Sequence, residues 1–106
     1  MKDEFAWKVI PQNHITIDFA GCHYAEDIHT VLKDSLGFPD RYGANWSAFW
    51  DYLDDFCGDR EENTTIRLVG LAKLPKDLND YAQKMLEIFH RAEQQYPLIR
   101  ILEETD

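Results

Sequence analysis

The sequence has few cysteines, few basic residues and no long apolar run. Its two cysteines, Cys22 and Cys57, match neither the spacing of a metal site nor the density of a disulfide-rich domain. We therefore expect two free thiols, as in a reducing cytoplasm. No stretch approaches the roughly 18 apolar residues of a membrane-spanning helix, and the first ten residues lack the apolar core of a signal peptide. These absences predict a cytoplasmic protein without a membrane segment.

Motifs for catalysis and cofactor binding are also missing. The sequence has no glycine-rich phosphate loop, no Gly-x-Ser-x-Gly and no paired catalytic carboxylates at a strand end. The acids of residues 51–62 lack the alternating spacing and central glycine of a calcium loop. Four histidines without metal-ligand spacing are expected at surface or capping positions: His14, His23, His29 and His90. We expect no cofactor, no metal ion and no enzymatic activity.

The charge of the chain is strongly one-sided. Twenty acidic residues outweigh eleven basic ones, which gives a formal net charge of −9. Nucleic acid and anionic membranes repel such a chain, whereas cationic partners attract it. The alternative is that acidity serves solubility alone.

Strand-like and helix-like segments alternate along the 106 residues, a length that fits one domain, 1–106. Gly37 and Gly58 are placed to end the first two helices, and Pro75 suits the first turn of the third. The order β-α-α-β-α-β predicts an α/β fold, a small three-stranded parallel sheet packed with helices. Strands are expected at 15–19, 66–69 and 98–102, and helices at 25–36, 46–57 and 76–95.

Aromatic and acidic residues concentrate in residues 42–56. On a helix that follows Asn45, one side is apolar, with Trp46, Phe49 (with Trp50), Leu53 and Phe56. The opposite side carries Ser47, Asp51, Asp54 and Asp55. An acidic helix face is often only solvated surface. However, aromatic residues beside charges are typical of interface hot spots, and a cationic partner relieves the repulsion between Asp51 and Asp55.

This segment resembles the signature of the barstar family. The residues that carry the resemblance are Tyr42-Gly43-x-Asn45-x-x-Ala48-x-Trp50-Asp51-x-Leu53. The similarity covers about residues 14–102 and leaves 1–13 as an N-terminal extension. It implies an inhibitor whose loop and second helix plug the active site of a ribonuclease, with Asp51 in the place of a substrate phosphate. A carboxylate suits that role because it accepts two bonds from one guanidinium group.

The sequence departs from the family's pattern at Arg41, Ser47 and Arg91. The resemblance implies a loop tyrosine and two helix acids at these positions. Either the target surface differs from barnase, or Asp54 and Asp55 take over part of the binding. The residues expected to bind the partner are Arg41, Tyr42, Gly43, Asn45, Ser47, Trp50, Asp51, Asp54 and Asp55.

Several of these residues also have a structural interpretation. Tyr42 and Trp50 are suited to packing the helix onto the sheet as well as to binding. Asn45 suits a helix N-cap, and Gly43 suits a backbone angle that other residues resist. The apolar run 5–10 either packs on the domain or pairs with a partner.

Three functions are compatible with the sequence. The leading hypothesis is an immunity protein that is monomeric alone and forms a 1:1 heterodimer with a basic ribonuclease or nuclease toxin domain. It would bind neither nucleic acid nor membrane. The alternative is an adaptor that binds a non-nuclease basic protein through the same face, as Arg41, Ser47 and Arg91 favour. The third is a small metal-dependent hydrolase that uses the acidic loop.

Overall fold

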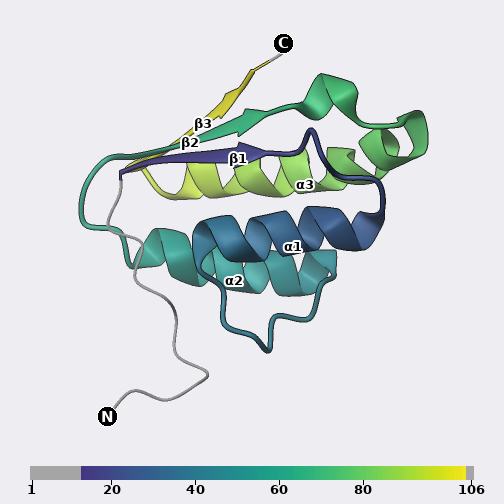
Figure 1. Ribbon diagram of the computed structural model, residues 1–106. Coiled ribbons are helices and arrows are strands. Elements are labelled where there is room, and N and C mark those ends of the chain that lie inside the picture. The colour runs from purple at the N-terminus through teal and green to yellow at the C-terminus, as the bar shows by residue number, and fades with distance from the viewer. Residues whose placement is uncertain (1–12, 105–106) are drawn as a thin grey trace.

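Three parallel strands form a sheet that follows the chain in order, β1-β2-β3 (Figure 1). The computed structural model describes residues 13–104, so the predicted N-terminal extension lies outside the described residues except for Asn13. The predicted β-α-α-β-α-β order is confirmed, with one added 3₁₀ helix. The elements are β1 (His14–Asp18), α1 (Ala25–Leu36), α2 (Trp46–Gly58), β2 (Thr64–Val69), η1 (Leu71–Lys73), α3 (Lys76–Gln95) and β3 (Ile99–Glu103).

Alternating side chains give the sheet one apolar face. In β1 and β2, Ile15 pairs with Ile66 and Ile17 pairs with Leu68, and all four side chains are buried. Ile101 of β3 continues this row opposite Ile66. The alternate residues of each strand face the other way and are more exposed. One face therefore forms the floor of the core, and the other borders solvent.

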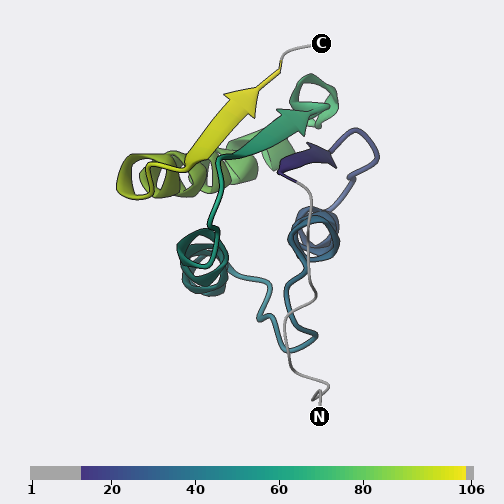
Figure 2. The same ribbon diagram turned by 90° about the vertical axis from the view of Figure 1, so that its left-hand side faces the viewer.

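All three helices lie on the same side of the sheet (Figure 2). Right-handed crossovers that advance in one direction across a parallel sheet place successive helices on one face, which accounts for this layout. α1 packs against β1 and α3 against β3, while α2 packs on α3. The buried ring of Phe49 in α2 lies 5.1 Å from Phe89 of α3 and 6.2 Å from Phe38 of the α1–α2 loop, between ring centroids. α2 is therefore fixed from two sides.

The helix ends largely follow the predicted signals. Gly37 ends α1 in the left-handed conformation, with φ of 75°, and its N–H donates to the Lys33 carbonyl over 2.9 Å. α2 ends at Gly58, one residue beyond the predicted bound at 57, and Gly58 does not end it in the way that Gly37 ends α1. Gly58 is still helical, and Asp59 follows in right-handed geometry with its N–H on the Asp55 carbonyl, so no left-handed residue is needed.

Other predicted boundaries also shift slightly. Pro75 precedes α3 as its N-cap rather than lying in the first turn. β1 and β3 are each displaced by one residue from the prediction. β2 begins two residues early because Thr64 donates its N–H to the Leu98 carbonyl over 2.7 Å. Cys22 and Cys57 are buried free thiols, as predicted. Within residues 13–104, the helices are all too short or too polar to cross a membrane.

Candidate protein-interaction site

A surface groove of about 380 Å³ runs between α2 and α3. α2 presents Asp51 to it because the opposite side of this helix is buried through Phe49 and Leu53. Aromatic, acidic and basic side chains share the lining, which is the composition of a protein-binding surface rather than of a closed ligand pocket. The lining residues are Trp46, Ser47, Trp50, Asp51, Lys84, Ile88 and Arg91.

The Asp51 carboxylate is exposed and has no hydrogen-bond or ion-pair partner within residues 13–104. Asp55, one turn further along α2, is exposed and equally unpaired within the same residues. Asp54 differs, because it accepts a hydrogen bond from the Tyr96 hydroxyl. This bond raises the pKa of Tyr96. Asp51 and Asp55 are therefore available to a cationic partner, whereas Asp54 joins α2 to the end of α3.

Two of the three acids of α2, Asp54 and Asp55, lie toward the electrostatically unfavourable end of the helix. α2 has no acidic residue in its first turn and no basic residue in its last. Asp54 and Asp55 instead lie near its C-terminus, where the helix dipole presents partial negative charge. This arrangement costs stability in the free protein, and a cation bound against the acids would remove the cost.

Trp50 of α2 and Arg91 of α3 both line the groove and contact each other. The guanidinium carbon of Arg91 lies 4.9 Å from the centroid of the half-buried Trp50 ring, which is cation–π geometry. Trp46, which also lines the groove, is half-buried, and its ring centroid lies 4.5 Å from that of His29 and 4.8 Å from that of Tyr81. The groove therefore combines a fixed cation on α3 with a free carboxylate on α2.

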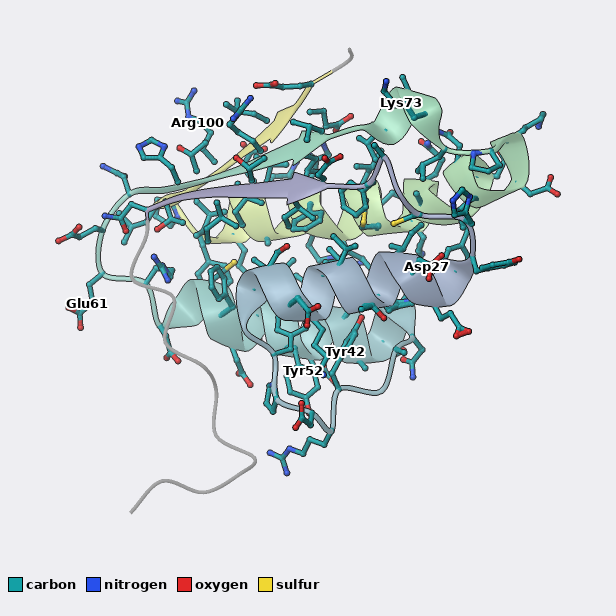
Figure 3. The ribbon with its side chains drawn as sticks, viewed as in Figure 1. Asp27, Tyr42, Tyr52, Glu61, Lys73 and Arg100 are labelled. Atoms are coloured by element: carbon teal, nitrogen blue, oxygen red, sulfur yellow. The ribbon has the colours of Figure 1, made fainter. Side chains whose placement is uncertain are left out.

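The loop 37–45 leads into α2 and is anchored by aromatic residues. Tyr42 is 8% exposed, and its ring lies 5.0 Å from Phe38 and 5.6 Å from Tyr52, which lies beside it in Figure 3. Its hydroxyl is 2.6 Å from Nδ1 of His29. Burial raises the pKa of Tyr42. Tyr42 thus fixes the loop from within, while Arg41 is exposed.

Asn45 sets the start of α2. Its side-chain oxygen accepts the Ala48 N–H over 2.8 Å, and its amide nitrogen donates to the Gly43 carbonyl over 3.2 Å. The cap thereby fixes both the preceding turn and the direction of the helix that carries Asp51.

Residues 12–105 match the family described as Barstar (barnase inhibitor). The chain belongs to the barstar family. It is also similar to a protein of Bacillus subtilis (strain 168) named "Putative ribonuclease inhibitor YrdF", with 33% identity over 81 residues. That alignment covers 76% of this chain and 86% of the relative.

One predicted role in this barstar-family chain was wrong. Gly43 is absent from the glycines with positive φ, which are Gly37 and Gly70 in the described part of the chain. The left-handed residue of the loop is Ala44, with φ of 53°. The Asn45 side-chain amide donates to the Gly43 carbonyl. The left-handed position of this turn is therefore one residue after the glycine.

The expected surface or capping position was also wrong for His29. This residue is 3% exposed, with its Nδ1 bonded to Tyr42 and its Nε2 lying 2.8 Å from the Tyr81 hydroxyl. Two hydroxyl partners let a neutral imidazole be buried, and burial lowers the pKa of His29. Its spacing of three from Leu32 and seven from Leu36 on the buried side of α1 was the signal in the sequence.

The other histidines are more accessible. His14 and His23 are exposed, and His90 is half-buried between Glu103 and Glu93. Hydrogen bonds to Glu103 first, and then Glu93, raise the pKa of His90 against its partial burial. In residues 13–104, no three acidic, histidine or cysteine side chains are arranged to hold a metal ion.

Proposed function

We propose that this chain inhibits a basic ribonuclease by docking α2 and the loop 37–45 into the enzyme's active site. The observation that carries the proposal is the exposed, unpaired carboxylate of Asp51 on a rigid helix of a barstar-family fold. A relative whose name describes a ribonuclease inhibitor supports the same class of partner.

The mechanism is occupation of the active site. The Asp51 carboxylate presents two oxygens at a fixed position, as a substrate phosphate does, and accepts paired N–H groups from the enzyme's cations. Asp55 adds negative charge one turn away, and Trp50 supplies a rigid apolar contact beside it. No bond is made or broken, because inhibition requires only that substrate is excluded.

The remaining predicted residues divide into two roles. Tyr42, Gly43 and Asn45 hold the loop and the start of α2, so they act by placing Asp51. Arg41 and Ser47 are exposed, and they adjust which ribonuclease surface fits.

The biological role that follows is that of an immunity protein. A monomer in the cytoplasm would bind one ribonuclease or nuclease toxin domain and so protect the cell that makes it. The net charge of −9 favours a cationic protein partner over nucleic acid or an anionic membrane.

The test is inhibition by the parent and by Asp51→Ala. We expect the parent to inhibit purified barnase, or to rescue cells expressing a nuclease toxin encoded beside its gene, and Asp51→Ala to lose at least about 2 kcal/mol of binding. Asp34→Ala is the matched control, since Asp34 is an exposed acid on α1. Equal protection by parent and Asp51→Ala would contradict the mechanism.

A second candidate function is an adaptor that binds a basic protein without nuclease activity. The observation in its favour is that Lys84 and Arg91 line the same groove as Asp51, where a uniformly basic active site would be repelled. Failure of the parent to inhibit either ribonuclease, together with stoichiometric binding of a cationic protein without nuclease activity, would favour this function.

A further inference from the structure

β3 is an edge strand, and one side of its backbone faces away from the sheet. The Thr64 N–H donates to the Leu98 carbonyl, and the Glu104 N–H donates to the Leu68 carbonyl, so the even-numbered residues of this segment face β2. The odd-numbered residues therefore direct their N–H and C=O groups away from β2. The Ile99 N–H donates to the Tyr96 carbonyl over 3.0 Å, so the open part of the edge is at Ile101 and Glu103. Such an edge is a template for another strand.

Side chains of α3 close this edge. The Ile101 N–H donates to Oε2 of Glu93 over 2.9 Å, and the Glu103 carboxylate is hydrogen-bonded to Nε2 of His90. Nδ1 of His90 lies 3.3 Å from Oε1 of Glu93, so one imidazole holds both carboxylates. A carboxylate thus takes the position at which a neighbouring strand would supply a carbonyl oxygen.

The surroundings of the edge would otherwise favour pairing. A groove of about 550 Å³ lies beside it, between α3 and Glu103. Leu102, on the face without helices, is 38% exposed, and Arg100 projects from that face (Figure 3). An exposed leucine on an edge strand is a known hazard for self-association.

We propose that Glu93 keeps the β3 edge closed, and that without it β3 pairs with β3 of a second copy of this chain. The side chains of β3 favour a second copy of this chain as the partner at this edge. Antiparallel pairing centred on Leu102 sets Leu102 against Leu102 of the other copy and Arg100 against Glu104 of the other copy. The Glu104 carboxylate already accepts two hydrogen bonds from Arg67, and its remaining lone pairs can accept from Arg100. The two-fold axis passes through the Leu102 pair, so the Arg100–Glu104 contact forms twice and the assembly closes as a dimer.

The experiment compares the mass of Glu93 variants in solution. Glu93→Ala removes the acceptor, and we expect its weight-average mass in sedimentation equilibrium to double at high micromolar concentration. Glu93→Gln retains an oxygen that accepts the Ile101 N–H, so it remains monomeric. Glu87→Ala is the matched control, because it removes the same charge from an exposed residue of α3 that pairs with Lys84 instead. It also remains monomeric.

A double variant tests the pairing register. Glu93→Ala combined with Leu102→Arg places like charges opposite each other and returns the protein to a monomer. A monomeric Glu93→Ala, equal dimerisation by Glu87→Ala, or a double variant that still dimerises would each overturn the proposal. Circular dichroism confirms that each variant is folded.

Amide hydrogen exchange in the parent tests the closed edge without any substitution. The Glu103 N–H faces the same edge, and the described residues offer it no acceptor. After correction for intrinsic rates, we expect the Ile101 amide to exchange at least about fivefold more slowly than the Glu103 amide. Equal protection factors for the two amides would overturn the proposal even if Glu93→Ala did not fold.

Discussion

Single side chains in this protein divide between those that are exposed to solvent and those that support the candidate site from the core. Asp51 belongs to the first group, and the buried pair His29 and Tyr42 belongs to the second. His29 joins α1, the loop 37–45 and α3, since Tyr42 and Tyr81 bond its two nitrogens. The loop that precedes Asp51 is therefore anchored to α1 and α3 through one buried histidine.

Acid should weaken the fold through His29. Its pKa in the folded protein lies below the ordinary 6.5, so the unfolded chain takes up a proton first as the pH falls. The stability that neutral His29 contributes is complete above pH 6.5 and is lost as the pH falls below it toward the folded pKa. Urea unfolding from neutral to mildly acidic pH should show a decreasing free energy of unfolding, with a flatter dependence in His29→Gln.

His90 affects the pH dependence of stability in the opposite direction to His29. The His29→Gln experiment therefore needs a His90 variant as a control. Its raised pKa contributes stability that is present at acidic pH and is lost as the pH rises through the folded value. His90→Gln should therefore steepen the loss of stability on the acidic side. If His29→Gln and the parent had parallel pH profiles, the buried imidazole would not be the titrating group.

The side chains of the candidate site were predicted unevenly from sequence. Helical spacing indicated which of Asp51 and Phe49 faces solvent, because that depends only on local periodicity. The Asp54 contact with Tyr96 joins residues 42 positions apart, and spacing along one helix does not reveal it. The stacking of Arg91 on Trp50 is equally a product of how α2 and α3 pack.

At the scale of elements, α2 is the helix whose charges oppose its own stability. Asp54 and Asp55 lie toward the negative end of the dipole, and Asp51 and Asp55 repel each other at a spacing of four. The cap at Asn45 and the buried stripe through Leu53 offset this cost.

Neutralising one of these acids should change stability and binding in opposite directions. We expect Asp55→Asn to raise the free energy of unfolding by about 0.5 kcal/mol and to weaken inhibition of the ribonuclease. Thermal unfolding and inhibition titrations measure the two effects. Asp34→Asn is the control, because Asp34 is also an exposed acid near the C-terminus of its helix, but on α1 and not on the proposed binding helix α2. A parallel loss of stability and inhibition in Asp55→Asn would contradict the argument.

The bounds of α1 and α3 followed from the sequence because apolar spacing, Gly37 and Pro75 mark them locally. η1 was not predicted, since three residues are too few to show a period. The strand ends depended on backbone partners such as Leu98, which only the assembled sheet supplies.

At the scale of the whole molecule, the net charge of −9 acts over distances longer than any single contact. The sequence was sufficient for the fold class and the family, since element order and the Tyr42–Leu53 signature lie within it. It did not reveal that all helices cover one face of the sheet, because that depends on strand order (Figure 2).

This charge predicts how association depends on salt. The rate constant for binding a basic ribonuclease should fall by about tenfold or more between low and physiological ionic strength, because salt screens electrostatic steering. The dissociation rate should change much less. Stopped-flow fluorescence of Trp50 and its neighbours measures both rates. An association rate that did not respond to salt would indicate that the overall charge has no part in the encounter.

Cys57 offers a consequence of a different kind. Burial, and then the nearby Asp54 charge, raise the pKa of its thiol to about 12, so the native protein exposes almost no thiolate. Burial also raises the pKa of Cys22, and that residue lies at the other end of the core, just after β1. Alkylating reagents therefore modify each sulfur only when the surrounding structure opens. The two cysteines are thus built-in probes of local opening. The ratio of their modification rates reports which end of the molecule opens more readily.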